Sequence, residues 1–398
     1  MTQRFQFALL MAMTMALGPL AIDAYLPAFP VMASDLSVTE GGIALTLSLY
    51  VFGLAIGQLI GGPLSDRLGR SPVLLIGLGI YFLSCIAIAY SPDLRWMIIW
   101  RLIQAFGGGW IAVSVPALVR DTAQGQEAAR LFTLIALIMF IAPALAPALG
   151  SILLLFWEWP SIFFFLAAYA GVLTLLLWHK LLKGLPKKPG KREPISNLLT
   201  NYGSVLKHPV AWKHIAIQAM GFSVIMLFVT HASFMYQSWF GLNNGQFSAA
   251  FASGVFLMGL VGTLNRRLLL SYATVSLLKL ALAVQVTALV IMNILLAFNS
   301  EWLWSFLPMM IVVGGTIGAI APNNQAAYLE YFSQLSGTAS AMLGAMQFII
   351  AGTIASLSTI YVDGNITRIT LTMLTVSALA LSSALLIPSR PLQEAETG

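Results

Sequence analysis

Long apolar runs alternate with short polar gaps along the whole chain. The runs lie at about residues 5–30, 40–64, 72–91, 96–118, 130–155, 160–179, 210–238, 246–264, 272–298, 302–322, 336–361 and 366–387. Each run is near the ~20 residues that a helix needs to cross a bilayer. Short segments of alternating polarity, which would predict an outer-membrane barrel, do not occur. The pattern predicts an all-α polytopic membrane protein with about twelve transmembrane helices in two groups of six.

The widest polar gap separates the two groups of runs. It extends from Lys180 to Pro209 and is rich in lysine, arginine and proline. Such a composition is typical of a solvated linker on anionic lipid, which we expect in preference to a site for a specific partner. We predict an N-terminal six-helix bundle over residues 1–180, a basic cytoplasmic linker over 181–209, a C-terminal six-helix bundle over 210–390 and a cytoplasmic tail over 391–398.

Composition narrows the class of protein further. Of the 398 residues, 59% are hydrophobic and 9% are charged, whereas soluble domains have about 25% charged residues. The net charge of +6 could suggest a nucleic-acid partner, but the bases gather in short gaps between apolar runs. A nucleic-acid surface would instead collect them on one face, so this class is excluded. The single cysteine, Cys85, cannot form an intramolecular disulfide.

The gaps differ in their content of lysine and arginine. If the N-terminus is cytoplasmic, the outer gaps hold only Arg95 and Arg368. The inner gaps then hold Arg4, Arg67, Arg70, Arg120, Arg130, Lys180, Lys183, Lys187, Lys188, Lys191, Arg192, Lys207, Lys213, Arg266, Arg267 and Arg390. Because such residues favour the cytoplasmic side, we predict that both termini are cytoplasmic. The first run has no small-residue cleavage site, so we expect a retained span there.

The gap between the second and third runs has a composition of its own. The stretch Gly62–Arg70 contains two glycines, one proline, one acid and two bases. Glycine permits close backbone approach and positive φ, and proline ends helices, as a tight connection between membrane helices requires. Asp66 lies at the edge of low dielectric and needs a cation or a helix N-terminus. Arg67 and Arg70 are the cations that could pair with it.

A weaker copy of this stretch closes the eighth run. Gly262–Arg267 follows the first copy by 200 residues, with Asn265 and Arg266 where Ser65 and Asp66 stand. The copies indicate that the two halves are repeats. Transporters that work by alternating access commonly have such halves, with the substrate site near the middle of the membrane.

Few ionisable residues fall inside the predicted spans: Asp23, Arg101, His231 and Lys279. Such residues are costly in hydrocarbon and often mark ion or substrate pathways. Asp23 is the only clear acid among them; it could couple transport to protons, or be a structural residue tied to Arg101 or to a hydroxyl. Arg101 could share that function or extend to the outer headgroups, where Lys279 would reach the inner ones. His231 could titrate or only form a hydrogen bond.

Polar and aromatic residues inside the spans are candidates for a substrate pocket. Gln104 lies three residues after Arg101 and shares its helix face. Aromatic side chains make adaptable apolar pockets, although in membrane helices they often only pack. The predicted pocket residues are Tyr25, Gln104, Phe222, His231, Tyr236 and Asn323. The fifth run also contains Pro143, Pro147 and Gly150, which predict a bent, closely packed helix.

Four of these features together resemble one transporter family. They are Asp23-x-Tyr25-Leu26-Pro27-x-x-Pro30, the Gly62–Arg70 stretch, Arg101-Leu102-Ile103-Gln104-x-x-Gly107 and Pro147-x-x-Gly150. The set is similar to the twelve-span drug:proton antiporters of the major facilitator superfamily, and the Asp-x-Tyr-Leu-Pro stretch to its Bcr/CflA (bicyclomycin and chloramphenicol resistance) group. The motifs are dense only in the first half, and Ala146-Pro147 stands where the family has Gly-Pro.

The resemblance implies roles for individual residues. Asp23 and Arg101 would couple transport to protons, and Pro143, Pro147 and Gly150 would form the antiporter helix. Asp66 would stabilise the outward-open state at the cytoplasmic closure. The conformational gate would consist of Gly62, Asp66, Arg67, Gly69 and Arg70.

We therefore expect a monomeric, proton-driven exporter of small, mostly apolar antimicrobials in the bacterial inner membrane. Its partners would be the drug, protons and the lipid bilayer; no enzymatic activity, cofactor, metal or nucleic acid is expected. The chain has no Gly-x-x-x-x-Gly-Lys-Ser/Thr loop, so ATP is not the expected energy source. Two alternatives stay open: a proton-linked importer or exporter of a small metabolite such as a nucleobase, and a membrane sensor or scaffold that transports nothing.

Overall fold

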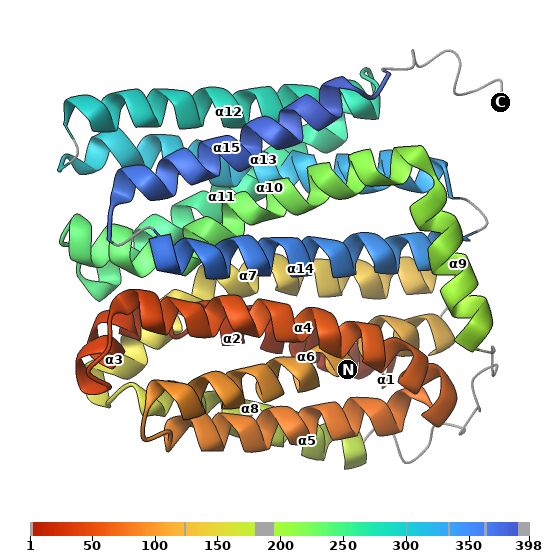
Figure 1. Cartoon of the computed structure of the whole chain (residues 1–398). Coiled ribbons are helices and arrows are strands. Elements are labelled where there is room, and N and C mark those ends of the chain that lie inside the picture. Colours follow the sequence, from red (N-terminus) through yellow and green to blue (C-terminus); the bar gives the residue numbers. More distant parts are fainter. Residues whose placement is uncertain are drawn as a thin grey trace. The chain divides into compact units, whose positions relative to one another are not determined.

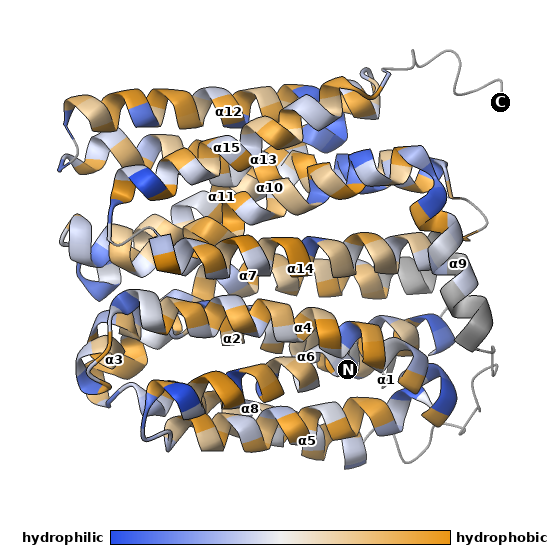
Figure 2. Ribbon diagram, in the orientation of Figure 1, coloured by the Kyte–Doolittle hydropathy of each residue, from blue (hydrophilic) through white to orange (hydrophobic). Residues whose placement is uncertain are grey.

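The computed structural model describes residues 3–122, 125–179, 195–299, 301–332, 335–361 and 364–388. Regular structure in these residues is entirely helical, and twelve helices are long and apolar enough to cross a membrane. Hydrophobic residues cover most of each long helix, and hydrophilic residues gather toward the helix ends (Figure 2). The prediction of an all-α protein with twelve spans is confirmed.

The chain divides into two compact units, Met1–Arg192 and Glu193–Gly398. Part of the predicted linker, residues 181–194, and the predicted tail, 391–398, lie outside the described residues. The rest of the linker contains a helix that the sequence analysis did not predict, α9 (Ile195–Lys207). Its last turns pack against other helices of the second unit, and Val205 is fully buried in a cluster with Ile215 and Leu343.

The first unit contains spans one to six (Figure 1). Its helices are α1 (Gln3–Met15), α2 (Leu17–Asp23), the 3₁₀ turn η1 (Leu26–Ala28), α3 (Phe29–Asp35), α4 (Glu40–Leu68), α5 (Arg70–Ala89), α6 (Leu94–Thr122), α7 (Gly125–Phe156) and α8 (Pro160–Leu177). The first four pieces together make span one, Gln6–Asp35.

The second unit contains α9 and spans seven to twelve (Figure 1). Its spans are α10 (Pro209–Ser233) with the π-helix η3 (Phe234–Trp239), α11 (Asn244–Leu268), α12 (Thr274–Phe298), α13 (Leu303–Glu330), α14 (Ser336–Tyr361) and α15 (Ile366–Leu385). The change from α to π geometry at the end of span seven widens the last turns of that helix.

The same packing pattern occurs in both units. In the first, α6 packs against α4 and α5, and α5 against α8; in the second, α13 packs against α11 and α12, and α12 against α15. Span one contacts α6, α7 and α8, as span seven contacts α13, α14 and α15. This correspondence bears out the two six-helix repeats that the loop copies indicated.

Glycine sets the separation between α4 and α6. An added Cβ on Gly57 would lie 2.5 Å from the carbonyl oxygen of Phe106, and one on Gly109 would lie 2.6 Å from the backbone nitrogen of Gln58. The two helices therefore meet backbone to backbone, as small residues permit in membrane proteins. Gly318 of α13 makes the corresponding close approach to Met258 of α11. Close glycine contacts therefore hold α6 against α4 in the first unit and α13 against α11 in the second.

Candidate functional site

Span one is interrupted where Asp23 lies. Helix α2 ends at Asp23, and the 3₁₀ turn η1 leads into α3. Pro27 has no backbone N–H to donate to the carbonyl of Asp23, and Pro30 has none for the carbonyl of Leu26. The prolines thus explain the break between α2 and α3. The Asp23 side chain is 5% exposed at this break.

Arg101 of α6 is fully buried beside the break. Its Nη2 donates to the carbonyl oxygen of Ala21 at 3.0 Å, and its Nη1 donates to Oε1 of Gln104 at 2.7 Å. The carbonyl of Ala21 belongs to the last turn of α2, where a cation is favoured by the helix dipole. The guanidinium therefore caps the helix that carries Asp23. It does not extend to the headgroups, because none of its surface is exposed.

Two tyrosine rings enclose the guanidinium. The Arg101 Cζ atom lies 4.3 Å from the ring centroid of Tyr25 and 4.4 Å from that of Tyr50, within the range of cation–π attraction. The Tyr25 hydroxyl lies 3.2 Å from Oγ1 of Thr46, which fixes the first ring. The second ring, Tyr50 on α4, was not among the predicted residues. No motif marks it, and only the packing of α4 on α6 brings it to Arg101.

Asp23 and Arg101 do not pair in this conformation. Asp23 forms no hydrogen bond or ion pair with the described residues, whereas the guanidinium is held by Ala21, Gln104 and the two rings. The two structural alternatives for Asp23, a tie to Arg101 and a tie to a hydroxyl, are both absent here. Asp23 is also the only Asp or Glu that is buried among the described residues.

Gln104 extends the Arg101 contacts to a third helix. Its Oε1 accepts from Arg101, and its Nε2 donates to the sulfur of Cys85 in α5 at 2.9 Å. Gln104 and Cys85 are both fully buried. Gln104, predicted as a pocket residue, here orients the guanidinium and joins spans three and four.

The predicted antiporter helix contacts the same break. An added Cβ on Gly150 of α7 would lie 2.9 Å from the carbonyl carbon of Ala24 and would overlap its oxygen. Pro143 and Pro147 lie inside the same helix. Any larger residue at position 150 would push α7 away from the segment next to Asp23. Two motifs that are far apart in the sequence therefore meet at one backbone contact.

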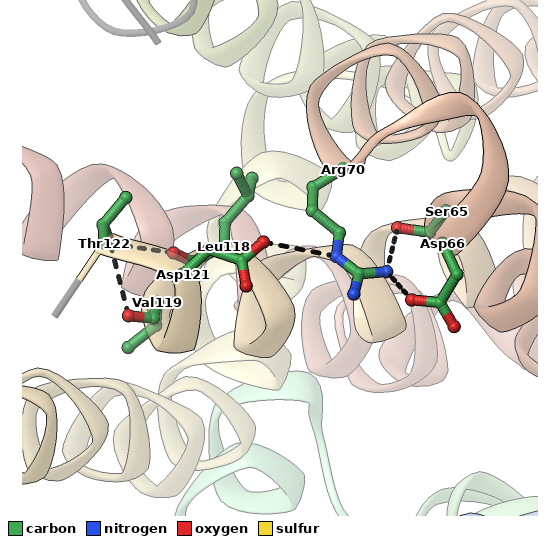
Figure 3. A network of polar contacts seen from close by, with 7 residues as sticks. All are labelled: Ser65, Asp66, Arg70, Leu118, Val119, Asp121 and Thr122. Atoms are coloured by element: carbon green, nitrogen blue, oxygen red, sulfur yellow. Dashed lines mark hydrogen bonds and ion pairs between the residues drawn. The ribbon is translucent and has the colours of Figure 1, made fainter. Parts of the chain in front are cut away.

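A second set of charged residues surrounds the connection between α4 and α5 (Figure 3). Arg70 pairs with Asp66, and its Nη1 also donates to Oγ of Ser65 at 3.4 Å. Its Nε lies 3.4 Å from Oδ2 of Asp121 at the end of α6. Arg70 is thus the cation that Asp66 was predicted to need. Arg67 is exposed and forms no ion pair with the described residues.

Asp121 was not predicted as a member of this network. It follows Arg120 at the end of the fourth apolar run, where an acid among bases is the only signal that could have indicated it. By holding one guanidinium between two carboxylates, the network ties the ends of spans two, three and four together. All three groups are partly solvated, so each contact contributes modestly and is weakened by salt.

We expect Gly69→Ala to destabilise this connection. Gly69 alone joins α4 to α5, and its φ of 96° and ψ of 153° lie in a region that is essentially restricted to glycine. Alanine there should cost about 1–3 kcal/mol of stability. Thermal unfolding of the purified protein would measure it. Gly79→Ala is the matched control, because an added Cβ at Gly79 meets no other atom within 4 Å. Equal unfolding temperatures of the two variants would show that alanine is not strained at position 69.

The second copy of the loop uses amides in place of charges. Asn265 of α11 and Asn323 of α13 exchange two hydrogen bonds, each 2.9 Å between Nδ2 and Oδ1. Both residues are buried. Asn265 occupies the repeat position of Ser65, and its contact with Asn323 joins the ends of spans eight and ten through paired amides. Asn323, predicted for the pocket, is engaged in this contact.

The other predicted pocket residues of the second unit lie in separate places. His231 of α10 lies with its Nε2 2.8 Å from Oγ of Ser358, whose own hydroxyl donates to the carbonyl of Ala355. Ser358 therefore accepts, and Nε2 of His231 carries the proton. Tyr236 is buried among Phe228, Phe247 and Phe306. The remaining residue, Phe222, is half-buried and forms a perpendicular ring pair with Phe348 of α14, with centroids 5.2 Å apart.

Comparison with known proteins identifies the family to which the chain belongs. Residues 9–356 match the family model of the Major Facilitator Superfamily. The uncharacterized MFS-type transporter YdgK of Bacillus subtilis (strain 168) is 31% identical over 366 residues, which cover 89% of each chain. The bicyclomycin resistance protein homolog of Haemophilus influenzae is 27% identical, with 89% of this chain and 88% of the relative covered. The chloramphenicol resistance protein of Pseudomonas aeruginosa is 28% identical, with 86% and 80% covered.

A solved structure shows the same fold. The crystal structure of a D-xylose-proton symporter superposes with a TM-score of 0.77, covering 96% of this chain and 97% of the other at 13% identity. At that identity the likeness extends to the fold alone. The family model and the relatives together confirm the resemblance to drug antiporters of the Bcr/CflA group. The chain therefore belongs to the major facilitator superfamily and is a membrane transporter, not an enzyme.

Proposed function

We propose that this transporter exports small, mostly apolar antimicrobials from the bacterial cytoplasm in exchange for protons. The observation that carries the proposal is the break in span one. It presents a buried carboxyl group, that of Asp23, at the end of α2. Arg101 caps the end of α2 through the carbonyl of Ala21 and does not form an ion pair with Asp23. Relatives named for resistance to bicyclomycin and chloramphenicol support antimicrobials as substrates.

In this mechanism Asp23 takes up and releases the proton. A carboxyl group without a fixed cationic partner can be neutral in one conformation and ionised in another, as alternation of proton and drug requires. Arg101 is held by the carbonyl of Ala21 and by two rings, and it keeps the break in place while the proton moves. The Arg70 network closes the cytoplasmic ends of spans two to four. The protein would act as a monomer in the inner membrane, with both termini cytoplasmic as the basic residues predict.

Drug susceptibility is the direct test. A bacterial host that lacks its own efflux pumps should tolerate more chloramphenicol or bicyclomycin when it expresses this chain. Adding a protonophore should remove the gain, because the proton gradient is the energy source. Tolerance unchanged by expression, in cells that contain the protein in their membrane, would contradict drug export. Flux in everted vesicles gives the direction: uptake of drug into the vesicle interior corresponds to export from the cell.

A further inference from the structure

The second unit contains a row of amides that no motif marked. Asn324 of α13 donates through Nδ2 to Oε1 of Gln218 in α10 at 3.0 Å. Gln218 in turn donates through Nε2 to Oε1 of Gln347 in α14 at 2.8 Å. Three helices are joined by this row. Polar residues inside apolar runs are the only signal in the sequence that could have indicated it.

One backbone carbonyl sets the direction of the row. Asn324 Nδ2 also lies 3.0 Å from the carbonyl oxygen of His214, which can only accept. Asn324 Oδ1 is then the acceptor for Nδ1 of His214, 2.8 Å away. The orientation of Asn324 is therefore determined, and each following amide must donate to the next. Aligned hydrogen bonds of this kind polarise one another.

The row ends in an unused donor. Oε1 of Gln347 accepts from Gln218, and Nε2 of Gln347 has no hydrogen-bond partner among the described residues. Both glutamines are half-buried, in contrast to Asn324, which is fully buried. The open end of the row thus presents N–H groups at a partly accessible position.

Aromatic rings and free space lie next to this donor. Phe222 follows Gln218 by one turn of α10, and Phe348 follows Gln347 directly; their perpendicular rings lie 5.2 Å apart. Gly344 precedes Gln347 by one turn of α14, on the same helix face. An added Cβ on Gly344 would meet no atom within 4 Å. Donor, rings and space therefore share one surface, defined here as the Gln347 surface.

The depth of the Gln347 surface excludes contact with lipid tails. Gln218 lies roughly 14 Å and Gln347 roughly 17 Å along their helices from the first residues of α10 and α14. Both distances are near the middle of a hydrocarbon layer ~30 Å thick. An amide N–H group without a partner, such as Nε2 of Gln347, would cost several kcal/mol against hydrocarbon at that depth, since nothing there can accept its hydrogen bond. The surface must face water or a ligand.

We propose that the Gln347 surface binds the aromatic part of an exported drug that carries an acceptor oxygen. The ligand class is a neutral aromatic compound with a nitro or carbonyl group, which would accept from Nε2 of Gln347 while its ring packs on Phe222 and Phe348. The inference rests on the proposed drug export and adds the substrate class and the residues that select it. Compounds without an acceptor oxygen would gain only the ring contact.

Equilibrium binding to the purified full chain in lipid nanodiscs tests this, with chloramphenicol as the probe. Gly344→Leu adds a branched side chain at a position where a Cβ meets no atom within 4 Å, and it should weaken chloramphenicol binding at least tenfold. Gly79→Leu is the matched control, because Gly79 of α5 is equally open and lies in the other unit; it should bind as the parent does. Gln347→Glu replaces the donor with acceptors and should weaken binding roughly tenfold. Tetraphenylphosphonium, which has rings and no acceptor oxygen, should lose no affinity in Gln347→Glu, because a new carboxylate can only attract its positive charge.

The outcomes separate this inference from the proposed function. Parent binding that is unchanged in both Gly344→Leu and Gln347→Glu would overturn the Gln347 surface and leave drug export standing. Absence of chloramphenicol binding by the folded parent would also overturn it, while the susceptibility assay decides export independently. Equal losses for chloramphenicol and tetraphenylphosphonium in Gln347→Glu would show that the substitution disturbs the bundle and would contradict selection by the acceptor oxygen.

Discussion

Asp23→Asn is expected to abolish proton-driven accumulation while some binding of neutral drugs survives. Asparagine has nearly the shape of a protonated aspartate but cannot release a proton, so the carrier loses its exchange partner. Moving one charge through 100 mV supplies about 2.3 kcal/mol, which supports a roughly 40-fold concentration ratio for one proton per drug. That ratio should fall to about one in the variant. Because Asp23 is only 5% exposed, its substitution should change proton coupling and leave the outer surface of the protein nearly as it is.

Substrate-induced proton release from the purified protein, measured at several pH values, checks this expectation. The parent should release protons on adding drug, and Asp23→Asn should not. Glu158→Gln is the control, because Glu158 is an exposed acid of the same unit. Release by Asp23→Asn equal to that of the parent would place the coupling group elsewhere. His231, buried and bonded to Ser358, would be the next residue to substitute.

Arg101→Lys should lower both stability and transport, although the charge is retained. Lysine cannot reach the carbonyl of Ala21 and Oε1 of Gln104 together, and its ammonium cannot stack flat between Tyr25 and Tyr50. Losing one charge-assisted hydrogen bond and part of two cation–π contacts should cost about 3 kcal/mol. The end of α2 would then be uncapped, and the position of Asp23 less defined.

Thermal unfolding in detergent and transport in vesicles measure the two parts of this prediction. Arg95→Lys is a matched control, because Arg95 is exposed near the start of the same helix. The unfolding temperature and the transport rate should both fall in Arg101→Lys and stay at the parent's values in Arg95→Lys. If Arg101→Lys lost transport at full stability, Arg101 would act in proton transfer itself and its capping of α2 would be secondary.

Much of the fold was predictable because the bilayer demands long apolar helices. The run predicted at 40–64 is α4, Glu40–Leu68, which continues through the polar residues of the loop. An apolar run stops at the first charged residues, so hydropathy underestimates the length of the helix. The helix itself ends where the backbone changes direction, here at Gly69 with its φ of 96°. The break in span one was likewise predictable, because proline removes backbone donors wherever it stands.

The candidate site was only partly predictable. Asp23, Arg101 and Gly150 were marked by residue type, because a charge or a close glycine inside a span is costly or distinctive by itself. Their relation was not: the sequence suggested an Asp23–Arg101 pair as one alternative, and the structure caps α2 with Arg101 instead. Which acceptor a buried guanidinium uses depends on which helix packs beside it.

By itself, the sequence determined the twelve spans, the two repeats and the ionisable residues inside spans, such as Asp23 and Arg101, that mark the candidate site. These follow from hydrophobic length and from the cost of polar groups in hydrocarbon, which act on each segment separately. Only the tertiary structure decided that Tyr50 covers Arg101, that Asp121 joins Arg70 and that three amides from three helices form one directed row. Such contacts join residues far apart in the chain, and they depend on the close approach of helices that glycine and shape complementarity permit.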